Sequence, residues 1–328
     1  MLMIVAHHYV VNSGLIECID MQTSLHFRDY FLLVFGWGGK TGINCFVLIT
    51  GYFMCTSAIT KKKFFKLLGE RYFYSVTIWC LFFFTGYETF TVKGLLKMIF
   101  PFFTVADNFT SCFLLFYLLI PFLNKLIHAL TEKEHFCLII WCVIVYVILP
   151  SFGKANIVFN YITWFSILYV IASYIRLYPK EWFDNIKVTG LMAGASLLLS
   201  WLSVVVLAIL SRVLEKEIGL CYFFVADSNK VLALLAGVSA FLFFKNIKIA
   251  HNKIINTIAA STFGVLLIHA NSDTMRHWLW KDICNNVGVY HNGNVIIHAI
   301  VSVAAIYAVC TLIDVVRKDI EARLHKEI

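Results

Sequence analysis

The sequence predicts an all-α fold, a polytopic membrane helix bundle of about ten transmembrane helices. The prediction rests on the composition of the 328 residues, of which 60% are apolar and only 14% are charged, with a mean hydropathy of +0.81. Average globular domains are ~45–50% apolar and ~25% charged. So few charges cannot cover the surface of a compact soluble protein, and so many apolar residues exclude a disordered chain.

Ten apolar segments along the chain are the predicted spans. A helix needs ~20 residues to cross the hydrocarbon core, so ten spans take up ~200 residues and the rest forms connections and tails. We therefore expect a single membrane domain over residues 1–328 with no separate soluble domain. In chain order the segments are 1–12, 33–55, 68–86, 109–129, 136–151, 158–178, 187–212, 230–245, 254–271 and 293–316.

The first segment is shorter than a complete span. Twelve helical residues rise only ~18 Å, whereas the hydrocarbon core is ~30 Å thick. Met1 opens directly into the apolar run, without the basic region and the small-residue cleavage site of a signal peptide. We therefore expect the true first span to begin upstream of Met1.

Basic residues are distributed unequally over the two sides of the predicted bundle. The connection after the second segment contains Lys61, Lys62, Lys63 and Lys66, which place it in the cytoplasm. Alternating from there, 17 of the 27 Lys and Arg residues fall on the cytoplasmic side and 10 on the outer side. We therefore predict that both termini are cytoplasmic, and that the longer connections, 13–32, 87–108, 213–229 and 272–292, lie outside.

The net charge of +8 is interpreted in the same way, as cytoplasmic loops facing anionic membrane lipid, and no nucleic-acid partner is expected. The ten cysteines are scattered without a Cys-x-x-Cys pair, so we interpret them as small apolar residues. No His or Cys cluster has the spacing of metal ligands, and no metal site is expected. A P-loop, a dinucleotide-binding glycine motif and a serine-hydrolase elbow are also missing from the sequence.

Ionisable residues inside a span are costly, and they are therefore the first candidates for function. His7 and His8 lie in the first segment, and adjacent helical residues point about 100° apart. His8 shares its face with Asn12, whereas His7 shares its face with apolar residues. We favour His8 as the inward residue and a candidate general base, because the ordinary pKa of histidine lies near ~6.5. A packing histidine is the open alternative.

Two further segments carry polar residues at membrane depth. In 42–53, Asn44 needs a hydrogen-bond partner, while Thr50 can bond a backbone carbonyl of its own helix. In 261–271, His269 lies near the outer end of the ninth segment and Asn271 follows at the rim. An interfacial histidine is the alternative there. In the last segment we interpret His298 as a packing or interfacial residue and Asp314 as paired with the basic tail.

These segments resemble the motifs of the acyltransferase-3 family of integral membrane O-acyltransferases. The first span of that family carries an arginine, ten intervening residues and a histidine, and His8 stands at the histidine place. The arginine place falls four residues before Met1. The run 42–53 is similar to the second-span signature, with Asn44 at its aspartate or asparagine place and Thr50 at its serine place.

The resemblance continues through the later spans. The stretch 108–124 resembles a tryptophan-phenylalanine to tyrosine-x-x-x-proline span, with Asn108 in place of the tryptophan. Residues 262–269 match a threonine-phenylalanine-glycine-x-tyrosine-leucine-isoleucine-histidine motif that ends at His269, with Leu266 for the tyrosine. Arg71 stands where the family has an arginine opening its third span. The resemblance covers the whole chain.

The resemblance implies transfer of an acyl group, usually acetyl, from acyl-CoA to a hydroxyl of a surface polysaccharide or glycoside, in a bacterial inner or plasma membrane. Acyl-CoA is then a donor substrate, with no permanently bound cofactor, and the partners are the glycan or lipid-linked sugar acceptor and membrane lipid. His8 is the implied catalytic base, Asn44 and Thr50 line the chamber, and His269, Asn271 and Arg276 face the acceptor. The implied contacts to the CoA phosphates come from Lys61, Lys62, Lys63, Lys66 and Arg71.

Two alternatives remain open at this point. One is a transporter or flippase of a lipid-linked sugar, which would move its substrate without consuming acyl-CoA. The other is a catalytically inactive member of the family.

Overall fold

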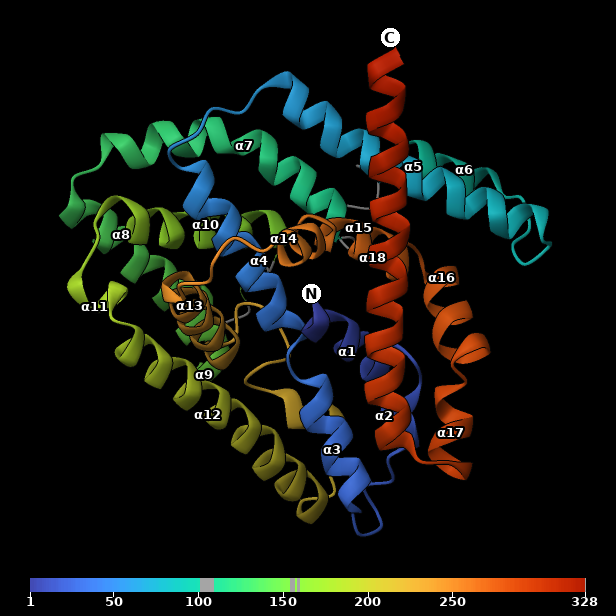
Figure 1. The fold of residues 1–328 in the computed structure, drawn as a ribbon. Coiled ribbons are helices and arrows are strands. Elements are labelled where there is room, and N and C mark those ends of the chain that lie inside the picture. The colour runs from blue at the N-terminus through green and yellow to red at the C-terminus, as the bar shows by residue number, and fades with distance from the viewer. Residues whose placement is uncertain (101–108, 154–156, 158–159, 328) are drawn as a thin grey trace. The chain divides into compact units, whose positions relative to one another are not determined.

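The computed structural model describes residues 1–100, 109–153, 157 and 160–327, and within them all regular structure is helical (Figure 1). The predicted all-α fold is therefore confirmed. By length and composition, five stretches of these described residues can cross a membrane: Phe27–Met54, Phe109–Ala129, Glu132–Phe152, Ile186–Val213 and Val295–Leu324. Three shorter apolar helices are Leu2–Val11, Tyr161–Leu177 and Val231–Asn246.

The count of about ten spans is thus not confirmed, although each of the ten predicted segments is helical or largely helical. The remaining two predicted segments do not form a helix that is both long and apolar enough to cross a membrane, for different reasons. The third, α5 (Lys61–Phe84), carries several charged residues in its first half. The ninth is broken into two short helices, α14 (Lys253–Ala260) and α15 (Thr262–His269).

The chain forms two compact units, each of which is discontinuous in sequence. Unit 1 comprises residues 1–39, 70–98 and 248–328. Besides the second part of α5, α14 and α15, its helices are α1 (Leu2–Val11), α2 (Leu15–Cys18), α3 (Phe27–Gly36), α6 (Val92–Ile99), α16 (Asp273–His277), the π-helix η4 (Trp278–Ile283), α17 (Asn286–Asn292) and α18 (Val295–Glu327).

The core of unit 1 forms where α1 packs on α3 and α18, and where α15 packs on α18. Tyr9 is fully buried, with its ring edge-on to Phe35 and Trp280. Asp29, in the first turn of α3, accepts hydrogen bonds from the backbone N–H of His26 at 2.7 Å and from the Tyr290 hydroxyl at 2.8 Å. An acidic residue there satisfies a helix N-terminus and so fixes where α3 begins.

Unit 2 comprises residues 40–69 and 99–247. It contains nearly all of α4 (Gly39–Met54) and the start of α5, and its other helices are α7 (Phe109–Ala129), α8 (Glu132–Val143), the π-helix η2 (Ile144–Ile148), α9 (Leu149–Phe152), α10 (Tyr161–Leu177), α11 (Glu181–Asp184), α12 (Ile186–Val213), the 3₁₀ helix η3 (Ile218–Tyr222) and α13 (Val231–Asn246).

Within unit 2, α10 packs on α7 and α8, and α12 packs on α13. Sequence signals set several of these helix starts. Thr131 and Glu134 form a capping box at α8, and Asn185 Oδ1 accepts from the backbone N–H of Lys187 at α12. Large apolar side chains such as Leu191 and Leu198 of α12 are exposed, as expected for a helix that contacts lipid.

The predicted outer connections are more structured than the sequence suggested. The stretch 13–32 contains α2 and the start of α3, 87–108 contains α6, 213–229 contains η3, and 272–292 contains α16, η4 and α17. Hydropathy misses these helices because they are too short to form a span-length apolar run. Asn108 lies outside the described residues.

Candidate active site

Two histidines from distant parts of the chain meet inside unit 1. His8 lies on the last turn of α1 and His269 is the last residue of α15. Nδ1 of His8 is 3.1 Å from Nε2 of His269, and the ring centroids are 5.1 Å apart. His269 is fully buried and His8 is partly buried. The structure thus brings together two residues that the sequence presented in separate motifs.

The hydrogen-bond partners of this pair assign its protons. Nδ1 of His269 lies 2.6 Å from the carbonyl oxygen of Val265, which can only accept, so Nδ1 carries the hydrogen. In the neutral ring, Nε2 of His269 is then unprotonated, and it accepts a hydrogen bond from Nδ1–H of His8. Neutral His8 therefore keeps its Nε2 unprotonated, and this nitrogen is the one that can accept a proton.

The neighbouring residue Tyr9 holds α1 in this orientation. Its hydroxyl is 2.7 Å from Nδ1 of His298, and its carbonyl oxygen accepts a hydrogen bond from Nδ2 of Asn286 at 3.0 Å. His298 is thus a packing residue, as the sequence analysis expected. Because adjacent helical residues are about 100° apart, fixing Tyr9 also fixes the direction of His8.

His7 bonds a different element, although its ring centroid is 6.0 Å from that of His8. Its Nδ1 donates to the carbonyl oxygen of Gly36 at 2.7 Å, at the end of α3. Asn12, which the sequence placed on the His8 face, follows the last residue of α1 and is exposed. His269 from α15 is therefore a polar partner of His8 within unit 1.

Asn44 is a fully buried junction of unit 2. Its Nδ2 donates to the carbonyl oxygens of Ser228 at 2.8 Å and Ala233 at 3.1 Å, and its Oδ1 accepts from the indole N–H of Trp164 at 2.9 Å. Helices α4 and α13 approach closely there, since a Cβ on Gly237 would lie 2.8 Å from Cβ of Asn44. Both amide hydrogens of Asn44 are thus used in joining α4 to neighbouring elements.

The other predicted chamber and acceptor residues have local partners. Thr50 donates to the carbonyl oxygen of Phe46 at 3.1 Å, one turn earlier in α4. Asn271 donates to the carbonyl oxygen of Leu267 at 2.9 Å, just after α15. Arg276 forms an ion pair with Asp273 within α16. Asn271 and Arg276 therefore lie on the chain segment that directly follows His269.

The four lysines proposed for the donor lie on the first two turns of α5, and all are exposed: Lys61, Lys62, Lys63 and Lys66. The N-terminus of a helix carries a partial positive charge that disfavours cations. A lysine cluster at this place therefore costs helix stability, and it makes a strongly positive surface suited to a phosphate ligand.

Arg71 differs from these lysines because it is buried, in unit 1. Its Nη1 donates to the carbonyl oxygen of Met98 at 2.7 Å, and its Nη2 lies 3.5 Å from the carbonyl oxygen of Lys97. These carbonyls belong to the C-terminal turn of α6, where a cation is favourable. Arg71 thus fixes α6 against α5.

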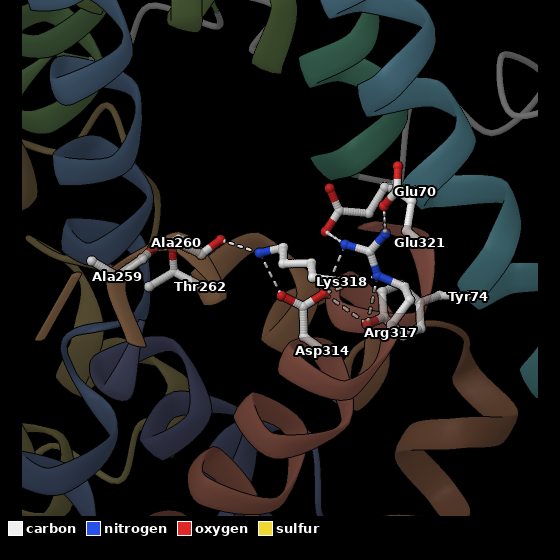
Figure 2. A network of polar contacts seen from close by, with 9 residues as sticks. All are labelled: Glu70, Tyr74, Ala259, Ala260, Thr262, Asp314, Arg317, Lys318 and Glu321. Carbon is white, nitrogen blue, oxygen red and sulfur yellow. Dashed lines mark hydrogen bonds and ion pairs between the residues drawn. The ribbon is translucent and has the colours of Figure 1, made fainter. Parts of the chain in front are cut away.

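Sequence reasoning found only one pairing of a larger charged cluster, which links α5, α14 and α18 within unit 1 (Figure 2). Arg317 contacts Glu70 and Glu321 at 3.0 Å each and Asp314 at 3.1 Å. Lys318 lies 2.7 Å from Asp314. The predicted pairing of Asp314 with the basic tail is therefore confirmed. Spacings of three and four residues along α18 were the available signal for these pairs.

Helices with apolar surfaces define this protein as an integral membrane protein, and the pair of His8 and His269 is its candidate proton-transfer site. Comparison with protein-family models matches residues 1–315 to a family described as an acyltransferase domain. The chain therefore belongs to the acyltransferase-3 family. No curated protein and no solved structure matches the chain.

Proposed function

We propose that the protein is a membrane O-acyltransferase that moves an acetyl or another short acyl group from acyl-CoA to a hydroxyl of a surface polysaccharide or glycoside. Family membership supports acyl transfer in general. The observation that supports a catalytic centre in this chain is the pair of His8 and His269, whose hydrogen bonding leaves Nε2 of neutral His8 as a base.

In the proposed reaction, Nε2 of His8 takes the proton of the acceptor hydroxyl as the oxygen attacks the thioester carbonyl carbon. The tetrahedral intermediate then collapses, the carbon–sulfur bond breaks, and the CoA sulfur leaves with the proton returned by His8. The imidazolium that forms meanwhile keeps its Nδ1–H on His269. General-base catalysis of this kind contributes ~10²–10⁴-fold to a rate.

The donor and acceptor regions are part of the same proposal. The exposed lysines at the start of α5 are proposed to bind the CoA phosphates from the cytoplasm, and Asn271 and Arg276 are proposed to face the acceptor. Asn44 and Thr50 are proposed to line the wall of the reaction chamber. We also propose that the protein spans a bacterial inner membrane about ten times with both termini in the cytoplasm. The bias of basic residues supports this orientation.

The test measures CoA release by chromatography, with purified full-length protein, acetyl-CoA and a panel of glycans. We expect acceptor-dependent turnover that His8→Ala lowers by ~10²–10⁴-fold. For His269→Ala we expect a loss of about 10- to 100-fold, because a hydrogen bond to a charged group is worth about 1.5–3 kcal/mol.

His7→Ala is the matched control. It removes a hydrogen bond to Gly36 and so lowers the yield of folded protein, but the activity per folded molecule should be retained. Full activity of both His8→Ala and His269→Ala would refute the general-base role. Absence of CoA release with every acceptor, together with uptake of a lipid-linked sugar into vesicles, would favour a transporter.

A further inference from the structure

The ninth predicted segment is interrupted at Ser261, which ends α14 and begins α15. A break inside a span exposes backbone groups of both helices, the last carbonyls of one and the first N–H groups of the other. In unit 1, two side chains of α18 lie at this break. Nζ of Lys318 donates to the carbonyl oxygen of Ala260, the last residue of α14, at 2.6 Å (Figure 2).

Asp314, one turn before Lys318, lies against the first turn of α15. A Cβ built on Gly264 would be 2.4 Å from Cγ of Asp314 and 2.4 Å from its Oδ1. Only a glycine permits this approach, because real Cβ atoms do not come that close to other atoms. Asp314 and Lys318 thus place a negative charge beside a helix N-terminus and a positive charge at a helix C-terminus, the favourable sign in both cases.

Asp314 is itself held in place from a third helix. Its side chain is fully buried, and its Oδ1 accepts from the hydroxyl of Tyr74 in α5 at 2.8 Å and from Arg317 at 3.1 Å. Arg317 in turn is paired with Glu70, also in α5, at 3.0 Å. The carboxylate therefore has a defined position that α15 must match, because packed buried networks do not deform continuously.

We propose that Asp314 and Lys318 are positioning residues for His269: they fix the place of α15 along α18 and so bring its last residue to His8. Gly264, the contact point, precedes His269 by five residues, or about 7.5 Å of helix rise. Over so short a helix, a shift at Gly264 is transmitted to His269. The proposal rests on the proposed function only in so far as the histidine pair is taken to be catalytic.

The test has one arm that needs no activity. Cysteines replace both histidines in the full-length protein, His8→Cys with His269→Cys, and a short bifunctional thiol reagent links them. Mass spectrometry of the linked peptide identifies this pair among the ten native cysteines. We expect Asp314→Asn to lower the yield of this link severalfold, and Lys318→Met to lower it by less.

The second arm measures turnover in protein that retains both histidines. A misplaced catalytic group can cost up to about 100-fold in rate, so Asp314→Asn should lower kcat by about 10- to 100-fold. The KM for acyl-CoA should change by less than about twofold, since only the transition state needs the aligned pair. Asp319→Asn is the matched control: Asp319 is exposed on the same helix, paired with Arg323, and should leave both readouts unchanged.

Gly264→Ala keeps the proposal testable if Asp314→Asn does not fold. Its added methyl group collides with Asp314, so it should lower the link yield by itself. Combined with Asp314→Gly, which removes every side-chain atom that the methyl group would meet, it should cost little more than Asp314→Gly alone.

An unchanged link yield in Gly264→Ala and in Lys318→Met overturns the positioning role. If the wild type shows no acyl-CoA turnover while the link yield still falls in the variants, the proposed function fails and the positioning role stands.

Discussion

The variant Asn44→Ala distinguishes a structural role of Asn44 from a role in binding substrate. Truncation removes three hydrogen bonds and leaves three buried groups without their partner: the carbonyls of Ser228 and Ala233 and the indole N–H of Trp164. Hydrogen bonds between membrane helices are worth about 0.6 kcal/mol on average, and net protein hydrogen bonds about 1 kcal/mol. Three of them give about 2–3 kcal/mol of destabilisation.

The assay is thermal unfolding in detergent, read together with activity per folded molecule. Destabilisation by 1 kcal/mol shifts Tm by about 2–4 °C in a unit of this size, so Asn44→Ala should lower Tm by about 4–12 °C. Asn44→Asp should be at least as harmful, because a carboxylate cannot donate to two carbonyls. Asn256→Ala, on the exposed face of α14, is the control that should leave Tm unchanged.

The refuting result is equally specific. If Asn44→Ala unfolds at the wild-type temperature but loses activity per folded molecule, the three hydrogen bonds do not hold unit 2 together. Asn44 would then act on the substrate, as the family motif implies.

Two further predictions concern polar side chains at the start of α5 and just after its end. Replacing Lys61, Lys62, Lys63 and Lys66 by Gln should raise the KM for acyl-CoA and leave kcat unchanged. The KM of this variant should also depend less on salt, measured between low and physiological ionic strength. The hydrogen bond from Tyr87, in the connection after α5, to Asp282 raises the pKa of Tyr87 to about 12. The stability contributed by this hydrogen bond should therefore persist through pH 10 and be lost as the pH rises toward 12, so Tm of Tyr87→Phe should converge with wild type only there.

Hydropathy found the helical segments because apolar runs of this length have few alternatives to a helix. It failed at features that carry no apolar signal. The break at Ser261 follows no proline or glycine. The lysine that bonds its last carbonyl comes from α18, 58 residues after Ala260. Short helices such as α6 and α17 are too brief to register as spans.

The candidate site was partly foreseeable. His8 stood out because a histidine in an apolar helix is costly. Its meeting with His269 could not be derived from spacing, since 261 residues separate them. Asn44 was correctly flagged as needing a partner, but two of its partners are backbone carbonyls, which every residue possesses and no sequence pattern reveals.

The division of unit 1 into three stretches has a consequence for biosynthesis. His8 is made before any residue of unit 2, whereas the helix that carries its partner is made after all of unit 2. At ~5–20 residues per second, the chain from His8 to His269, a sequence separation of 261, takes about 13–52 s to translate. During that time His8 has no His269 to bond, and the histidine pair forms only after the third stretch of unit 1 has been made. A ribosome stalled inside unit 2 would therefore leave an inserted protein that lacks its candidate active site.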